Sequence, residues 1–197
     1  MPSKMYTKPV EVSQSHHFHP PGAGGKKAGA CYDPLEWSAY FDLKEKINGV
    51  VPLYISGGEG HVFLCMHGAG HSALSFGVLA KHLGPACTVA AFDFRGHGDH
   101  HAENEADLSE AALVSDAVEV MKYVCSRFCE ASVILVGHSM GGSIATKAAA
   151  KALAEQEPWT RQIQGLFVID VVEGSAMDAL PFMESIVLSR PQEFQTL

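Results

Sequence analysis

From Trp37 onward, short apolar runs alternate with segments of helical periodicity. Turn residues bound each of the runs VPLYIS (51–56), HVFLCMHG (61–68), CTVAAFDFRG (87–96), SVILVG (132–137) and IQGLFVID (163–170). The first two, joined through Gly57 and Gly58, predict a hairpin-like entry into a sheet. The last three predict strands that are buried on both faces. The alternation as a whole is typical of an α/β fold, with a mostly parallel sheet flanked by helices.

Two helices are predicted between these strands. Asp107 and Glu110 have the spacing of a capping box, which predicts a helix beginning after Asp107. Its apolar positions form one stripe that we expect to face the core, namely Val114, Ala117, Val118, Met121, Val124, Cys125 and Phe128. The second helix, from Gly141 to about Glu155, is rich in alanine. Its small side chains would allow it to lie close against the sheet.

Residues 1–34 differ in composition from the rest of the chain. They combine Pro, Gly, Ser, Lys and His with few large aliphatic residues, so we expect a flexible tail before a single domain over 35–197. The cluster His16, His17 and His19 could ligate a metal, but no Cys or acidic partner stands at a ligand-like spacing. A solvated tail without a metal site is the favoured interpretation.

Charge and cysteine usage restrict the partners and the compartment. The formal charge of the 197 residues is -8, and no basic patch is interleaved with aromatic residues, so nucleic acid is not an expected partner. No apolar stretch has the length of a signal peptide core or a membrane span, so a membrane partner is not expected either. The five cysteines are odd in number and lie mainly in buried-type segments. We therefore expect a cytoplasmic or nuclear protein.

The segment Gly137-His138-Ser139-Met140-Gly141-Gly142 matches the pattern G-x-S-x-G. It follows a predicted strand and opens a predicted helix, as the nucleophile elbow of an α/β-hydrolase fold requires. Ser139 is then the candidate nucleophile, and Gly137, His138 and Gly141 build the sharp turn around it. The alternative is a glycine-rich turn between a strand and a helix, without chemistry.

A second glycine-rich segment, His67-Gly68-Ala69-Gly70, directly follows the predicted strand at 61–68. α/β-Hydrolases place an oxyanion-hole loop at this position. We assign the oxyanion donors to the backbone amides of Met140 and of Ala69 or Gly70, with the choice between the last two left open. An ordinary glycine-rich turn is the alternative.

The candidate acid is Asp170, which ends the strand that follows the nucleophile helix. Catalytic groups collect at the carboxyl ends of strands in open α/β sheets, and the acid follows the nucleophile in this fold. Glu173 and Asp178 are weaker candidates, and a helix cap or a solvated loop carboxylate is the alternative role for Asp170. Asp93 precedes the nucleophile in the chain and so does not fit the order expected of the acid.

We interpret Asp93, together with Arg95 and His97, as part of a structural network that braces the elbow.

No histidine follows His138, so the chain offers none in the expected order of a serine hydrolase triad. Without an imidazole base, the Ser139 hydroxyl is a weak nucleophile at neutral pH. The segment after Asp170 also shows no closing strand pattern. We therefore expect 35–197 to be the N-terminal part of a hydrolase domain whose C-terminal part, with the histidine, is missing, and we expect the isolated chain to be nearly inactive.

The runs HGAGHSALSF (67–76), GHSMGGSIA (137–145), VIDVVEGSAMDAL (168–180) and SRPQEF (189–194) resemble the protein phosphatase methylesterase family. The resemblance extends from about Tyr32 to Leu197. It implies a serine carboxylesterase that demethylates the C-terminal leucine of the protein phosphatase 2A catalytic subunit and needs no cofactor. It also implies that Ser139 is the nucleophile, that Asp170 is the acid, and that the histidine lies beyond Leu197.

Two other functions stay open at this point. The first is a generic hydrolase of small esters or lipids, because only the run at 168–180 singles out the methylesterases. The second is a catalytically inactive truncated isoform that acts as a binding protein, which the missing histidine supports.

Overall fold

The computed structural model describes residues 35–102, 104–170, 181–182 and 185. The predicted tail over 1–34 lies outside these residues. The strands are β1 (Leu43–Ile47), β2 (Val51–Ser56), β3 (Val62–Met66), β4 (Thr88–Phe92), β5 (Val133–His138) and β6 (Ile163–Ile169). The α-helices are α1 (Gly77–Leu83), α2 (Glu110–Arg127) and α3 (Met140–Ala154), and the 3-10 turns are η1 (Trp37–Ala39), η2 (Ala73–Phe76) and η3 (Pro158–Gln162).

The six strands form one mixed sheet in the order β1-β2-β4-β3-β5-β6. β4, β3, β5 and β6 are mutually parallel, whereas β2 pairs antiparallel with both β1 and β4. The prediction of a mostly parallel sheet is confirmed. The predicted hairpin between 51–56 and 61–68 is wrong, because β2 pairs with β4 across the sheet instead of with β3.

The hairpin partner of β2 is β1, which the apolar pattern did not predict. Its sequence, LKEKI, carries three charged residues, and only Ile47 is buried. β1 forms one edge of the sheet, where charged side chains are tolerated because they remain in water. The positive φ angles of Asn48 (52°) and Gly49 (75°) close the turn into β2.

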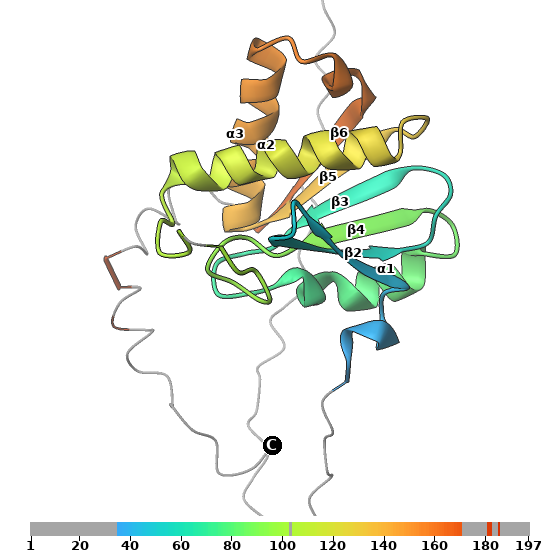
Figure 1. The fold of residues 1–197 in the computed structure, drawn as a ribbon, viewed down its shortest axis with the longest axis horizontal. Helices are drawn as coiled ribbons and strands as arrows, with labels where there is room; N and C mark the ends of the chain where they lie inside the picture. Colours follow the sequence, from blue (N-terminus) through green and yellow to red (C-terminus); the bar gives the residue numbers. More distant parts are fainter. Residues whose placement is uncertain (1–34, 103, 171–180, 183–184, 186–197) are drawn as a thin grey trace, which may run out of the picture. The chain divides into compact units, whose positions relative to one another are not determined.

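Helices cover both faces of the sheet (Figure 1). α2 and α3 lie on one face, where Leu64 and Met66 of β3 join a core cluster with Met121 of α2 and Ile144 of α3. α1 and η2 lie on the other face, where Cys65 belongs to a second cluster. Successive residues of β3 therefore serve opposite cores, as the alternation of side chains along a strand requires. The sheet is covered on both sides over its central strands.

α2 confirms the predicted helix but begins later than expected. Its N-cap is Ser109, whose hydroxyl accepts a hydrogen bond from the Ala112 amide at 3.4 Å. Asp107 instead accepts a hydrogen bond from the Ser109 amide, so the predicted capping box is wrong. The predicted stripe is buried or half-buried against the sheet. α3 begins one residue earlier than predicted and buries Gly141, Ala145 and Ala148.

β6 contradicts the expectation of a strand buried on both faces. Phe167 is 58% exposed, and its neighbours Leu166, Val168 and Ile169 are also exposed. β6 pairs only with β5 and stands at the edge of the described sheet, so an apolar strand here has fewer neighbours than one at the centre. Its apolar sequence is that of an interior strand.

Candidate active site

The predicted elbow is a sharp turn between β5 and α3. Ser139 adopts φ 51° and ψ -118°, a conformation that costs a non-glycine residue free energy and persists only where the surroundings enforce it. A Cβ on Gly137 would lie 2.4 Å from Gly142 Cα, and one on Gly141 would lie 2.2 Å from the Met66 carbonyl oxygen. The two glycines therefore allow the backbone contacts that hold the turn.

Backbone hydrogen bonds fix Ser139 from both sides. Its amide donates to the Ile169 carbonyl at 2.8 Å, and its carbonyl accepts from the Gly142 amide at 2.9 Å. The register pairs His138 with Ile169, so the residue after β6 lies at the same sheet edge as Ser139. The elbow is thus attached to β6 as well as to its own strand and helix.

The segment after β3 approaches the elbow through Gly68. A Cβ on Gly68 would lie 2.8 Å from His138 Nδ1 and 3.4 Å from Ser139 Cβ, so only glycine allows this approach without displacement. The predicted oxyanion residues Ala69 and Gly70 are exposed beside it, in a turn closed by a hydrogen bond from the His71 amide to the Gly68 carbonyl at 3.1 Å. Gly68 is the contact that the sequence reasoning missed.

Met140, the other predicted oxyanion donor, is the first residue of α3. The amides at the beginning of a helix have no partner within the helix and carry partial positive charge. Gly142 and Ser143 donate their amides to the Ser139 carbonyl. Met140 directly follows Ser139 at this helix start.

Asp170 lies next to His138 rather than in a completed triad. Its Oδ2 is 3.8 Å from His138 Nε2, which is too long for a hydrogen bond, and its side chain is 78% exposed. The ring of His138 also stacks on that of His71, with centroids 5.4 Å apart and planes 9° apart. Glu173 and Asp178, the weaker acid candidates, lie outside the described residues.

His67 is buried beneath this segment and cannot readily act as a base. Its Nε2 accepts a hydrogen bond from the Phe94 amide at 3.0 Å, and its Nδ1 donates to the Gly68 carbonyl at 2.8 Å. Burial lowers the pKa of His67 to about 4, because the charged imidazolium would lose its hydration. A neutral imidazole whose lone pair is already engaged does not take a proton from serine.

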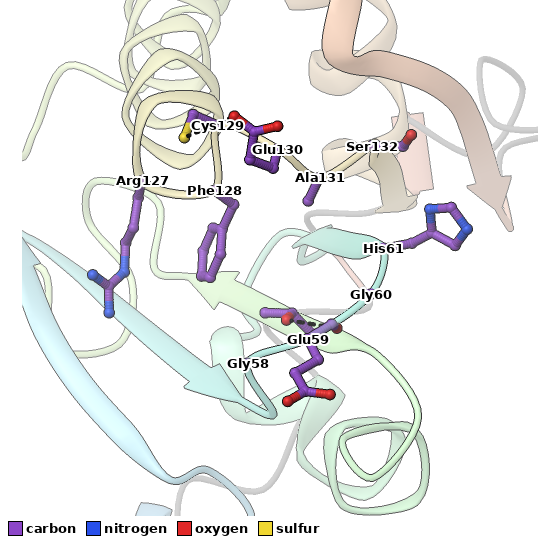
Figure 2. A pocket seen from close by; sticks show the side chains of 11 residues that line it. Gly58, Glu59, Gly60, His61, Arg127, Phe128, Cys129, Glu130, Ala131 and Ser132 are labelled. Carbon is purple, nitrogen blue, oxygen red and sulfur yellow. Dashed lines mark hydrogen bonds between the residues drawn. The ribbon is translucent and has the colours of Figure 1, made fainter.

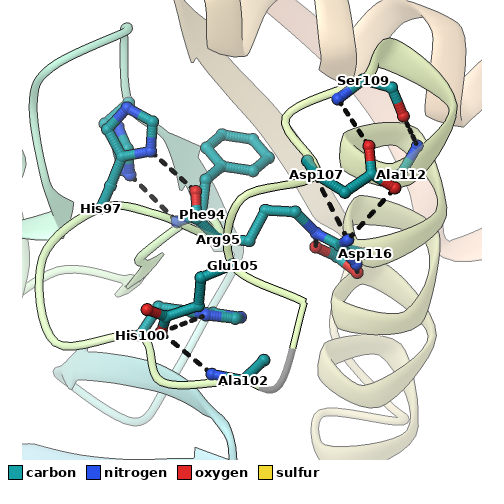
Figure 3. A network of polar contacts seen from close by, with 11 residues as sticks. Phe94, Arg95, His97, His100, Ala102, Glu105, Asp107, Ser109, Ala112 and Asp116 are labelled. Carbon is teal, nitrogen blue, oxygen red and sulfur yellow. Dashed lines mark hydrogen bonds and ion pairs between the residues drawn. The ribbon is translucent and has the colours of Figure 1, made fainter.

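Asp93, Arg95 and His97, which were predicted to brace the elbow, form polar contacts elsewhere, and Figure 3 shows those of Arg95 and His97. Arg95 makes two short hydrogen bonds to Asp116 of α2, at 2.5 and 2.6 Å, and this pairing raises the pKa of the guanidinium. His97 donates from Nδ1 to the Arg95 carbonyl at 2.9 Å. Asp93 accepts the amides of Ala73 and Asp99. The partners of these residues are therefore α2 and the segments after β3 and β4 instead of the elbow.

A separate hollow of about 520 Å³ lies at the other end of the strands. Figure 2 shows Arg127 and Phe128 from the end of α2 on one side and the turn Gly58–His61 on the other. Val62 and Val133 begin their strands beside this hollow, whereas Ser139 follows the carboxyl end of β5. The hollow is therefore not part of the Ser139 site.

In the described part of the chain, no group of three or more His, Cys, Asp or Glu side chains is arranged to hold a metal ion. The histidines at 16, 17 and 19 lie outside it. No helix within that part combines the length and apolarity needed to cross a membrane.

The strand order, the elbow after β5 and the glycine-rich segment after β3 define an α/β hydrolase. The model of the alpha/beta hydrolase family matches residues 62–195, and the chain belongs to that family. It is similar to protein phosphatase methylesterase 1 of Mus musculus, with 37% identity over 196 aligned residues, which cover 90% of this chain and 49% of that protein. Protein phosphatase methylesterase 1 of Schizosaccharomyces pombe is 36% identical, covering 82% of this chain and 50% of the relative.

These matches confirm the resemblance to the protein phosphatase methylesterases that the sequence motifs indicated. The chain spans about half the length of the curated relatives it matches. Among solved structures, a thermostable carboxyl esterase from Bacillus coagulans superposes with a TM-score of 0.53 at 22% identity, covering 74% of this chain and 49% of the esterase. At that identity the likeness shows the fold alone.

Proposed function

We propose that this chain is the nucleophile-bearing part of a serine carboxylesterase that removes the methyl ester from the C-terminal leucine of the protein phosphatase 2A catalytic subunit. The observation that carries the proposal is Ser139, held with φ 51° at the start of α3 against the buried Gly68. The names of the relatives, which are protein phosphatase methylesterases, support a methylated protein phosphatase as the substrate, and the 2A catalytic subunit is the finer part of the proposal.

In the proposed reaction, Ser139 Oγ attacks the ester carbonyl carbon while a histidine takes the hydroxyl proton. The developing oxyanion is stabilised by the amide of Met140 and that of Ala69 or Gly70. The histidine then gives its proton to the departing methoxide, and methanol leaves. Water hydrolyses the acyl-enzyme by the same steps, which restores Ser139 and releases the leucine carboxylate. Ser139, Asp170, the histidine and the backbone amides supply these roles without a cofactor.

The histidine of this scheme is proposed to come from sequence beyond Leu197. Within the described residues, no hydrogen bond joins a histidine to Ser139 Oγ, and His67 is committed to Phe94 and Gly68. Asp170 stands at the sheet edge beside Ser139, where it would orient such a histidine. On this basis the 1–197 chain by itself is expected to hydrolyse esters very slowly.

The phosphatase subunit is the proposed partner, and neither nucleic acid nor a membrane is proposed. The net charge of -8 opposes binding to a phosphate backbone. A cytoplasmic or nuclear location agrees with the cysteine usage and is proposed on that ground. Cell fractionation of the tagged protein would test the location.

The test compares substrates on the complete gene product. Methylated phosphatase 2A catalytic subunit and a simple aryl acetate are each incubated with the natural protein and with Ser139→Ala. We expect Ser139-dependent loss of the leucine methyl ester, measured by mass spectrometry of the subunit's C-terminal peptide. Cleavage of the aryl ester with the methylated terminus left intact would replace this proposal with the generic esterase.

A second measurement distinguishes the enzyme from the alternative of a catalytically inactive binding protein. If the complete gene product binds the phosphatase subunit but releases no methanol, the binding role holds and the enzymatic proposal fails. Turnover that Ser139→Ala abolishes, with binding retained, supports the enzyme.

A further inference from the structure

Two buried polar side chains outside the proposed chemistry contact the two ends of one short segment. The segment is Gly68–Ala73, which follows His67 and carries the proposed donors Ala69 and Gly70. His67 is fully buried and Asp93 is 1% exposed. Burying a polar or charged group costs free energy unless hydrogen bonds compensate it, so the partners of these two side chains show what they hold.

His67 connects the beginning of the segment to the end of β4. Its Nδ1 donates to the Gly68 carbonyl at 2.8 Å, while its Nε2 accepts the Phe94 amide at 3.0 Å. The two bonds together require the neutral tautomer with the proton on Nδ1. The lowered pKa of the imidazole agrees with that tautomer, since burial disfavours the charged form.

Asp93 connects the end of the segment to the loop after β4. Its Oδ1 accepts the Ala73 amide at 2.7 Å, and its Oδ2 accepts the Asp99 amide at 3.0 Å. A Cβ on Gly98, which has φ 54°, would lie 2.3 Å from the Asp93 carboxyl carbon, so the loop closes directly over the carboxylate. The carboxylate also accepts a longer hydrogen bond from the Tyr54 hydroxyl at 3.4 Å, and it contacts the segment through Ala73.

Between these two anchors the segment makes few ordering contacts besides the stack of His71 on His138. Gly68 and Gly70 are glycines, Ala69, Gly70 and His71 are exposed, and the one internal backbone bond is that of the His71 amide to the Gly68 carbonyl. Glycine gives the unfolded segment many conformations, so its folded position depends on the anchors at its ends. Yet Gly68 must keep its position against His138 and Ser139, where there is no room for a Cβ atom.

We propose that His67 and Asp93 are positioning residues that clamp Gly68–Ala73 to the end of β4, so that the backbone amides of this segment are presented beside Ser139. Use of those amides in catalysis rests on the proposed function. The clamp itself concerns only the position of a backbone segment. Misplacement of a catalytic group by about 1 Å can cost about 100-fold in rate, so the clamp contributes to turnover without touching the substrate.

The first test uses amide hydrogen exchange on the 1–197 chain, which requires no turnover. In Asp93→Asn, one carboxylate oxygen becomes an NH2 group, which donates and does not accept. The side chain can then no longer accept both backbone amides, so exchange at 68–73 should accelerate about tenfold. Asp116→Asn is the matched control, because it removes a carboxylate from the same polar region that contacts Arg95 but not the segment. Equal acceleration at 68–73 in both variants, or none in Asp93→Asn, would overturn the clamp.

A matched pair at His67 tests the other anchor and serves alone if Asp93→Asn does not fold. In His67→Asn, the side-chain amide can take the place of Nδ1 and still donate to the Gly68 carbonyl. In His67→Gln, the side-chain oxygen takes the place of Nε2 and leaves Gly68 without its donor. Exchange at 68–73 should therefore be fastest in His67→Gln, intermediate in His67→Asn and slowest in the natural chain. The reverse order of the two variants would contradict the proposal.

The second test measures kinetics on the complete gene product. Asp93→Asn should lower kcat about 10- to 100-fold with KM nearly unchanged, because the lost contact orients donors to the oxyanion of the transition state. Asp116→Asn should leave kcat unchanged. Weaker substrate binding, seen as a rise in KM with kcat intact, would overturn a positioning role. If the natural protein itself shows no turnover, the proposed function fails, while hydrogen exchange still decides the clamp.

Discussion

The carboxylate of Asp170 lies 3.8 Å from Nε2 of His138, the residue immediately before the proposed nucleophile. β6 places it there, because Ile169 pairs with His138 and accepts the Ser139 amide. The distance is too long for a hydrogen bond, and the Asp170 side chain is largely exposed. The proposed acid is therefore at the correct sheet edge, and its contact with His138 is weak enough to be exchanged for a stronger partner.

This relationship predicts different outcomes at the two positions. In the complete gene product, Asp170→Asn should lower kcat about 10³- to 10⁴-fold, as loss of a triad acid does, because the base would lose its orienting carboxylate. His138→Gln should cost less than about tenfold, since His138 serves the packing of the elbow against Gly68 and His71. Steady-state kinetics on both variants checks this. Equal losses would mean that His138, paired with Asp170, takes part in the chemistry.

The backbone strain at Ser139 predicts that glycine at this position is more stabilising than alanine. Ser139→Gly should raise the free energy of unfolding by about 1 kcal/mol relative to Ser139→Ala, because glycine adopts φ 51° without the steric cost that alanine retains. Urea denaturation of the two variants of the 1–197 chain gives the difference directly. A less stable glycine variant would show that the elbow is not strained.

The burial of His67 predicts a loss of stability in acid. Its pKa is about 4 in the folded chain against an ordinary value of 6.5, so the unfolded chain binds a proton that the folded chain does not. The contribution of neutral His67 is complete above pH 6.5 and is lost as the pH falls toward 4, by up to about 3 kcal/mol. Urea midpoints measured from pH 7 to 4.5 should fall in this window, and His67→Gln should flatten the fall.

For that measurement, His82→Gln is the control, because His82 is exposed on α1 and its Nδ1 only contacts the carbonyl of Val78. A slope that persists unchanged in His67→Gln would assign the acid sensitivity to another group.

The exposed strand β6 predicts association of the isolated chain. Phe167 is 58% exposed on an edge strand, and the residues beside it in the strand are also apolar and exposed. Exposed apolar edge strands tend to pair with other chains. Phe167→Lys should reduce light scattering of the 1–197 chain at a given concentration. Leu153→Lys is a matched control, since Leu153 is 59% exposed on α3 and does not belong to a strand edge. The same reduction in both variants would indicate a general charge effect.

The elbow could be predicted from sequence because its requirement is local. Gly137 and Gly141 have no room for a Cβ, and Ser139 occupies the strained position between them. The stripe of α2 could be predicted for a similar reason, since the periodicity of a helix is written in consecutive residues. The cap was misassigned because Asp107 and Ser109 are both good caps, and tertiary packing selects between them.

The pairing of β2 with β4 could not be predicted from pattern alone, because the register of distant strands is set by packing. β1 was missed because an edge strand can carry charge. The contact of Gly68 with Ser139 joins residues 71 positions apart in the chain, as numbered in the sequence. The burial of β6 was expected from its apolar residues, yet burial depends on what packs against a strand and not only on its composition.

The central claim, that Ser139 is the nucleophile, is tested most directly by locating a covalent adduct. The complete gene product is incubated with a fluorophosphonate, which reacts with serine nucleophiles that a base activates, and is then digested for mass spectrometry. The adduct is expected on the peptide that contains Ser139, and it should be absent from Ser139→Ala and nearly absent from the 1–197 chain. An adduct on another residue, or methylesterase turnover that persists in Ser139→Ala, would contradict the account.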